Sequence, residues 1–135
     1  MPGNDMYVRF VTPLIDPSTR VETGIFQSKF QLRENGCADW ILRELQPHWD
    51  WFNEHLAVPT RLGMHFRRRE SIWGVCWFRP QATAAIARAW RCRALMEEGG
   101  IPVRALVWRG RVQVLWSDDQ QAVIAPSKGM PRGFH

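Results

Sequence analysis

Residues 71–108 decide the fold class, and their sequence is SIWGVCWFRPQATAAIARAWRCRALMEEGGIPVRALVW. The apolar run Ser71–Phe78 is too short for a core helix and is followed by a proline, so it predicts a central strand buried on both faces. Gln81–Glu98 carries small and apolar residues at helical spacing, and the two glycines after it end the predicted helix. Ile101–Trp108 predicts another strand, so strands and helices alternate within one short stretch.

The segment that follows predicts a β-hairpin. Arg109-Gly110 is a plausible two-residue turn between Ile101–Trp108 and a second strand at Arg111–Trp116. Across that turn apolar residues pair with one another on one face, because side chains alternate along a strand. We expect that face to lie on the core, and a last strand to follow at Gln121–Ala125. The inner-face residues are Val103, Ala105, Val107, Val112, Val114 and Trp116.

Upstream of residue 71 the sequence predicts one strand and two helical segments. Met6–Val11 is rich in β-forming residues, and we expect Pro13 to stop this strand. Ile25–Asn35 predicts a short helix. Ala38–Leu56 has a continuous apolar stripe with a period of 3.6 residues. Because Pro47 lies inside the stripe, a kinked helix and two consecutive helices both remain open.

The elements follow one another in the order β-α-α-β-α-β-β-β. This order predicts an α+β fold, in which a mostly antiparallel sheet carries helices on one face. We expect a single domain over residues 1–125. Residues 126–135 are expected to form a flexible C-terminal tail.

Composition excludes several classes of protein. The chain has 135 residues, of which 45% are hydrophobic and eight are tryptophan, so one domain can bury an adequate core without disulfides or a metal. The three cysteines lack CxxC spacing, and we therefore expect a reduced, cytoplasmic protein with no cofactor. No apolar stretch approaches the ~20 residues that cross a bilayer, so no membrane partner is expected.

Charge is distributed unevenly along the chain. Residues 61–111 contain 11 arginines and three glutamates, giving +8, whereas the remainder of the chain carries −3. A basic segment of this kind can attract nucleic acid or another polyanion. The alternative is a general preference for arginine, since the chain has 16 arginines and two lysines.

The outer face of the predicted hairpin is the first candidate site. Trp108, Arg104 and Arg111 would lie there, and an aromatic ring beside cationic groups suits stacking and phosphate binding on a single-stranded nucleic acid. Two leucines on the same face favour another interpretation, in which a helix or a second copy of the chain covers it. Three consecutive arginines would extend the basic surface: Arg67, Arg68 and Arg69.

Two further candidates lie on the predicted helices. Glu44 and His48 are separated by four residues, so the carboxylate could orient the imidazole for acid–base chemistry. The competing interpretation is an ordinary boundary histidine. Arg93 projects toward an apolar stripe, where it would either bind an anion in a cleft or extend its charge to solvent. No spacing suited to a metal site is present.

The eight tryptophans divide into two groups. Trp40, Trp51 and Trp108 are placed where a partner could reach them. The other five are expected in the core or at its edge: Trp49, Trp73, Trp77, Trp90 and Trp116.

Several stretches resemble a small bacterial protein family of unknown function. They are YVRFVTPLIDPSTR…GIFQ near the N-terminus, WFNEHLAVP and WFRPQA in the middle, and GIPVRALVWRGRV followed by QAVIAP near the end. The likeness spans residues 7–125. It implies a bacterial, single-domain soluble protein and assigns no functional residue.

The leading hypothesis from the sequence is a non-enzymatic binding or interaction domain, because tryptophan and arginine are favoured at interfaces and no catalytic constellation is evident. Its partner would be another protein or a second copy of the chain, which would make it a homodimer. One alternative is nucleic-acid or polyanion binding through the arginine and tryptophan surface. The other is a small enzyme that uses the histidine–glutamate pair with an anion-binding arginine.

Overall fold

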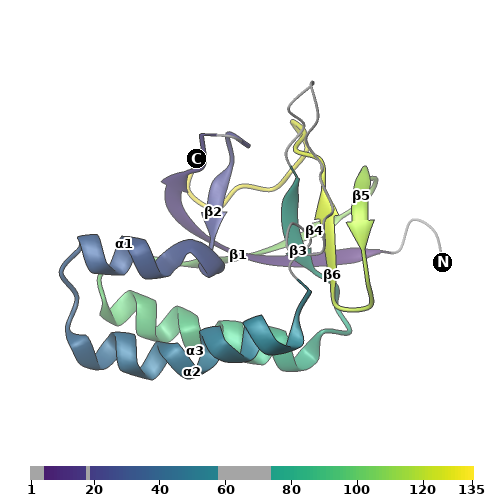
Figure 1. Cartoon of the computed structure of the whole chain (residues 1–135). Coiled ribbons are helices and arrows are strands. Elements are labelled where there is room, and N and C mark those ends of the chain that lie inside the picture. Colours follow the sequence, from purple (N-terminus) through teal and green to yellow (C-terminus); the bar gives the residue numbers. More distant parts are fainter. Residues whose placement is uncertain (1–4, 18, 58–73) are drawn as a thin grey trace.

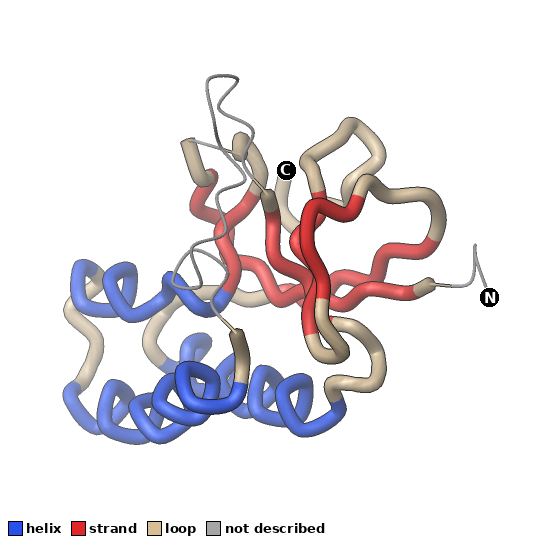
Figure 2. Tube along the Cα trace, turned by 45° about the vertical axis from the view of Figure 1, so that its right-hand side comes forward, coloured by secondary structure: helices blue, strands red, loops and turns tan. Residues whose placement is uncertain are grey.

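The structure is a computed structural model that describes residues 5–17, 19–57 and 74–135. Three α-helices lie together on one side of an antiparallel sheet, which confirms the predicted α+β fold (Figures 1 and 2). The strands are β1 (Met6–Ile15), β2 (Glu22–Gly24), β3 (Val75–Phe78), β4 (Arg104–Arg109), β5 (Val114–Ser117) and β6 (Gln121–Ile124). The helices are α1 (Ser28–Glu34), preceded by the 3-10 turn η1 (Ile25–Gln27), α2 (Asp39–His55) and α3 (Thr83–Glu98).

The helices begin and end close to the residues that the sequence indicates. α2 is one continuous helix with Pro47 inside it, which settles the alternative left open by the sequence. Gly36 ends α1 and Gly100 follows α3, both with positive φ, as expected for residues that terminate helices. None of the described helices is long and apolar enough to cross a membrane.

Strand β1 is the centre of the sheet and pairs with three other strands. β4 pairs with it from Met6 to Val11, so β2 and β3 must share its other edge. β3 pairs with β1 at Val8, and β2 pairs with it from Val11 to Ile15. β3 also pairs with β6, and β6 with β5, which confirms that β3 is a central strand.

The predicted hairpin between residues 101–108 and 111–116 is wrong. β4 pairs with β1 along its whole length, whereas β5 forms its hairpin with β6. A strand with alternating apolar residues can pair with any strand that has the same alternation. β1 is such a strand, and it pairs with β4 although the two are far apart in the sequence. In the β5–β6 turn the Asp118 carboxylate accepts hydrogen bonds from the N–H groups of Gln120 and Gln121 (2.9 and 2.8 Å), which stabilises that hairpin.

Strand β1 continues beyond Pro13, contrary to the expectation. One residue of β2 lies between Glu22 and Gly24, while three residues of β1 lie between their partners Ile15 and Val11. Pro13 lies in this interval, where the pairing between β1 and β2 is irregular. Its lack of an N–H group therefore removes no hydrogen bond from a regular pattern. The short strand β2 was not predicted from the sequence.

The sheet separates two groups of buried side chains. One group packs against the helices and includes Phe10, Leu45, Trp49, Phe78 and Met96. The other lies on the opposite face and includes Tyr7, Trp77, Trp108, Ile124 and Met130. The fold therefore buries a second apolar cluster on the face that carries no helix.

The last residues, expected to be a flexible tail, pack against the domain. Met130 is buried, and the chain end lies beside β2 (Figure 1). The Glu22 side chain, 1% exposed, accepts backbone N–H groups from Gly133 (2.7 Å), Phe134 and His135 (3.2 Å). A buried carboxylate needs donors of this kind, and its position in β2 was not identified from the sequence.

Candidate functional site

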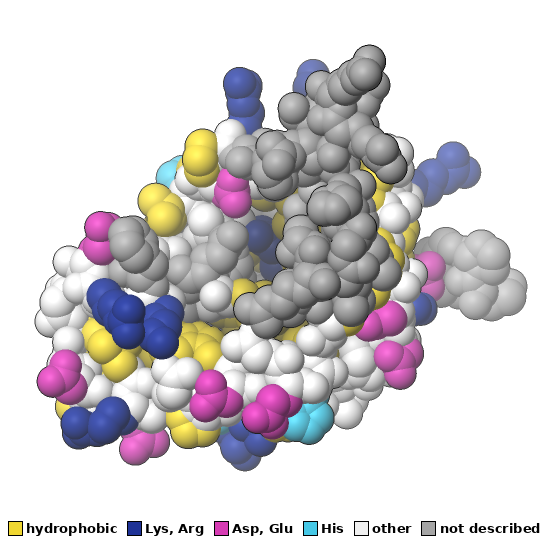
Figure 3. Space-filling view, viewed as in Figure 1, with side chains coloured by type: hydrophobic (Ala, Val, Ile, Leu, Met, Phe, Trp, Pro, Cys, Tyr) yellow, Lys and Arg dark blue, Asp and Glu magenta, His cyan; other side chains and the backbone are white. Residues whose placement is uncertain are grey.

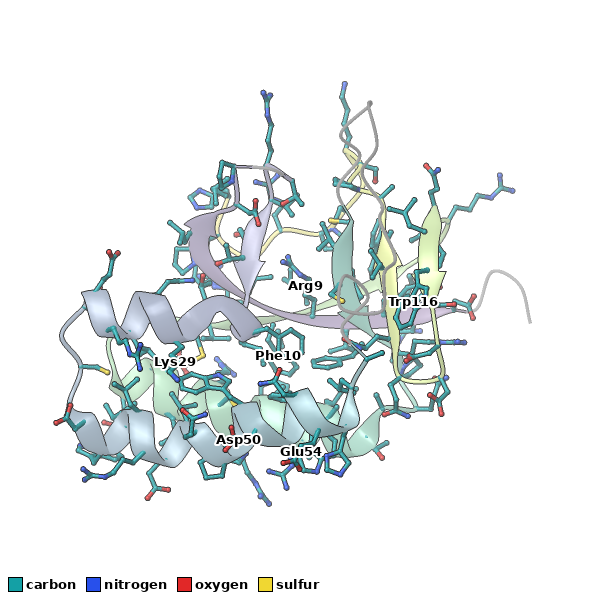
Figure 4. All side chains as sticks on the ribbon, in the orientation of Figure 1. Arg9, Phe10, Lys29, Asp50, Glu54 and Trp116 are labelled. Atoms are coloured by element: carbon teal, nitrogen blue, oxygen red, sulfur yellow. The ribbon has the colours of Figure 1, made fainter. Side chains whose placement is uncertain are left out.

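A cavity of about 170 Å³ lies at the point along β1 where its partner strand changes from β3 to β2. β2 and β3 diverge above β1, and Arg9 projects between them (Figure 4). Gly24 of β2, Cys76 and Trp77 of β3, and Ile25 of η1 line the cavity together with Arg9. The split in the sheet therefore creates a pocket with a cation at its base.

The Arg9 side chain is 9% exposed and has an unusual set of neighbours. Its Nη2 donates a hydrogen bond to the backbone carbonyl oxygen of Glu22 (2.6 Å), and its guanidinium lies 6.0 Å from the centre of the Trp77 ring. Burial lowers the pKa of Arg9 to about 10, so it is a cation at neutral pH. That hydrogen bond uses one of the five N–H groups of a guanidinium.

The nearby Glu22 carboxylate is already occupied. Besides the three backbone N–H groups of the tail, its Oε1 lies 3.9 Å from Nε of Arg132. The carboxylate raises the pKa of Arg9 less than burial lowers it. Glu22 thus neutralises part of the local charge while its oxygens serve the tail.

Two β3 side chains complete the pocket. Trp77 is 1% exposed, and its indole Nε1–H has no hydrogen-bond partner among the described residues. The Cys76 thiol donates to Oε1 of Gln121 (3.6 Å), and burial raises the pKa of this thiol to about 11. Cys76 is therefore an uncharged thiol at neutral pH, and the Trp77 N–H is a buried donor.

A second cavity of about 330 Å³ adjoins the first. Phe26, Cys76 and Gln121 line both of them, and the second extends along α2 past Trp49 and Phe52. The aromatic side chains are packed edge to face, with the Phe26 and Phe52 ring centres 5.0 Å apart. The two cavities are therefore neighbours that share part of their walls, and polar as well as apolar side chains line each of them.

This arrangement can hold an anion and offers little for catalysis. A buried guanidinium binds a carboxylate or phosphate through two parallel hydrogen bonds. Within the described ranges no group of three histidine, cysteine or acidic side chains is arranged to hold a metal ion.

The predicted outer face of the hairpin is buried in part in this structure. Trp108 is 7% exposed and packs against Trp77, with ring centres 5.4 Å apart, so its expected orientation is wrong. Arg104 is exposed, donates to the carbonyl oxygen of Gly133 and lies 4.6 Å from the Phe134 ring centre. Arg111 is exposed.

Other basic candidates are dispersed. Arg93 donates to the carbonyl oxygen of Val103 (3.0 Å) and forms an ion pair with Glu97 (3.3 Å), so it extends from the helix toward solvent. Arg67, Arg68 and Arg69 lie outside the described residues. On the face shown in Figure 3, described Lys and Arg side chains lie at the edges and in a group on the left, with acidic side chains between them.

His48 lies between α2 and α3, away from both cavities. Arg88 Nη1 lies 3.3 Å from His48 Nδ1, and because arginine can only donate, the imidazole nitrogen must accept. Burial, followed by Arg88 and Arg91, lowers the pKa of His48, while Glu44 opposes this effect. The structure therefore gives His48 a neutral state and a cationic neighbour, in place of the carboxylate-oriented pair expected from the sequence.

The tryptophan positions agree with the sequence in part. Trp40 is 45% exposed, as expected for a residue that a partner can reach. Trp49 and Trp77 are buried as predicted, whereas Trp90 is 46% exposed. Trp73 lies outside the described residues.

Sequence reasoning missed Arg9 as a site residue. A signal was present, because Arg9 stands alone among apolar residues in a strand whose alternation places it on the same face as Tyr7 and Val11. A charge at such a position needs a partner.

Comparison with protein families, curated proteins and solved structures finds no match to this chain. The resemblance to a small bacterial family therefore stays a prediction, and the functional argument depends on the site itself.

Proposed function

We propose that this protein is a non-enzymatic binding domain that holds the anionic group of a small molecule in the cavity between β2 and β3. The observation that carries this proposal is the buried Arg9 guanidinium, whose recorded hydrogen bond goes to a neutral carbonyl oxygen. Burying a cation is costly unless charge and hydrogen bonds compensate it. An anion in the cavity would supply both.

Electrostatics favour binding over chemistry at this site. The Cys76 thiol that lines the cavity has a pKa of about 11 and is a poor nucleophile at neutral pH. His48, the candidate acid or base, contacts Arg88 of α3 and lines neither cavity. A buried guanidinium is well suited to recognition, and it does not give up a proton easily near neutral pH.

The structure gives less support to the other hypotheses. Trp108 and Leu106 pack in the second buried cluster, so the face that was expected to stack on nucleic acid or meet a second copy of the chain is used internally. We keep a homodimer and polyanion binding as proposals without an assigned surface. A cytoplasmic location is likewise a proposal, supported by three free cysteine thiols.

The test is a titration of the protein with acetate, benzoate and inorganic phosphate at low salt, followed by NMR shifts of the arginine side-chain N–H groups. We expect saturable shifts at Arg9 and a loss of affinity of at least tenfold in Arg9→Met. Arg111→Met is the matched control, because Arg111 is exposed and lies outside both cavities. Equal binding by the two variants would refute the proposal.

A second variant separates binding from folding. Trp77→Phe keeps the aromatic ring in the core and removes the N–H group that lacks a partner. We expect this variant to remain folded by circular dichroism and to bind anions more weakly. Unchanged affinity in Trp77→Phe would show that the indole takes no part, and unchanged affinity in a folded Arg9→Met would overturn the function itself.

A further inference from the structure

We infer that the ligand is an amphipathic monocarboxylic acid, with its carboxylate at Arg9 and its apolar body in the larger cavity beside α2. This inference rests on the proposed function and names the class of ligand. Its first support is that Phe26, Cys76 and Gln121 line both cavities. The proposed ligand would pass these shared side chains to reach from Arg9 into the second cavity.

The sizes of the cavities indicate a molecule larger than a simple anion. The Arg9 cavity of about 170 Å³ is smaller than the roughly 300–1,000 Å³ typical of small-molecule sites. The adjoining cavity of about 330 Å³ falls within that range. An inorganic anion would fill the first cavity and leave the second one without an occupant.

The polar groups of the second cavity are largely engaged with one another. Lys29 donates to Oε1 of Gln46 (3.1 Å), and Gln46 donates to Asp50 (2.9 Å). Gln121 donates to the carbonyl oxygen of Ala57 (2.9 Å) while accepting from the Cys76 thiol. These polar side chains thus have partners within the chain, while Asn53 is a further polar group on the lining.

The apolar part of the lining comes from η1, α2 and the residues that follow α2. Phe26 of η1 contacts Phe52 of α2, with ring centres 5.0 Å apart. Trp49 of α2 and Leu56, directly after the helix, extend the lining. Such a wall favours a hydrocarbon or aromatic body.

The charge on the cavity wall favours a monoanion. Among the described residues that line the Arg9 cavity, Arg9 is the one basic side chain, and Asp16 on the same wall is acidic. A phosphate monoester carries close to two negative charges at neutral pH and would be only partly compensated by one guanidinium. A carboxylate matches its charge and its planar pair of donors.

The experiment measures affinity for straight-chain carboxylic acids from acetate to decanoate by calorimetry, with alcohols of equal length as controls. We expect the dissociation constant to fall about three- to fourfold per added methylene until the cavity is filled. The alcohols should bind at least tenfold more weakly, because they lack the charge that Arg9 recognises.

A space-filling variant tests where the chain lies. Ala57 lines the second cavity at the end of α2, so Ala57→Phe should shorten the best-binding acid while leaving acetate shifts at Arg9 unchanged. Pro102→Phe, outside both cavities, is the control. If small anions bind at Arg9 but affinity does not depend on chain length, the inference fails and the proposed function stands. If no anion of any length binds, the proposed function fails as well.

Discussion

Arg9 and Glu22 show how two buried charges of opposite sign are compensated differently. Glu22 accepts three backbone N–H groups and lies near Arg132, so its charge is compensated within the chain. Arg9 donates to the backbone carbonyl oxygen of Glu22, and burial lowers the pKa of Arg9 to about 10. The Glu22 carboxylate is thus committed to the tail, Asp16 is a second acidic group near Arg9, and the proposed ligand would use the remaining N–H groups of the guanidinium.

A titratable residue outside the site gives a pH prediction. The pKa of His48 is lowered by burial and by Arg88 and Arg91. The unfolded chain therefore binds a proton at this position at higher pH than the folded chain, since a free histidine titrates near about 6.5. Stability that the domain has above a pH of about 6.5 should therefore be lost as the pH falls through the lower pKa that His48 has in the folded chain.

The measurement is the free energy of unfolding in urea at several pH values between about 8 and 5. His48→Gln should lose less stability than the original chain over this interval. His55→Gln serves as the control, because His55 is exposed and stacks on Trp51. The same pH dependence in all three proteins would contradict the assigned environment of His48.

At the level of single residues, the sequence predicted burial better than it predicted sites. The α2 stripe placed Ile41, Leu45 and Phe52 correctly, because helical spacing determines which face a residue occupies. Trp108 was misplaced because alternation says which residues share a face, and the partner strand decides which face is buried.

At the level of elements, the partner exchange along β1 creates the pocket. On one edge of β1, the pairing with β3 is at Val8 and the pairing with β2 begins at Val11. Between these two residues β1 is paired only along its other edge, with β4. This arrangement depends on pairing between β1 and strands far away in sequence. Local patterns predict the strands and cannot choose among such partners, which explains why the hairpin was mistaken and the pocket was not foreseen.

The join between β3 and β6 gives a prediction at this scale. Gly74 precedes β3, and a Cβ atom at that position would collide with Cγ1 of Val123 and lie 3.1 Å from Cδ1 of Leu115. Gly74→Ala should therefore destabilise the fold by about 1–3 kcal/mol, as for other overpacked positions. Urea unfolding measures this loss.

Gly129→Ala is the matched control for that substitution. At Gly129 the nearest atom to an added Cβ would be the Ser127 hydroxyl oxygen at 3.9 Å, which is ordinary contact. We expect a change below about 0.5 kcal/mol there. Equal stability of the two variants would mean that β3 and β6 do not approach one another as closely as described.

At the level of the whole molecule, the final residues hold the second buried cluster in place. Met130 packs in that cluster, and residues 133–135 connect it to β2 through Glu22. His135 adds a contact between its Nε2 and the carbonyl oxygen of Pro13 (2.8 Å). The segment thus joins parts of the chain more than 110 residues apart in sequence.

Removal of residues 131–135 should consequently destabilise the domain. Glu22 would lose its three N–H donors and Arg132 while remaining in β2, and an uncompensated buried charge costs about 3–5 kcal/mol. Arg132→Met keeps the backbone donors and should cost much less, since its ion pair is long and partly exposed. Urea unfolding of the three proteins gives these differences.

A double-mutant cycle shows whether Glu22 is the reason for that loss. Glu22→Gln alone removes the charge, so deleting residues 131–135 from that variant should cost less than deleting them from the original chain. We expect a coupling of about 1–3 kcal/mol between the two changes. Additive effects would mean that the tail stabilises the domain through Met130 and its neighbours alone, with the buried carboxylate as a bystander.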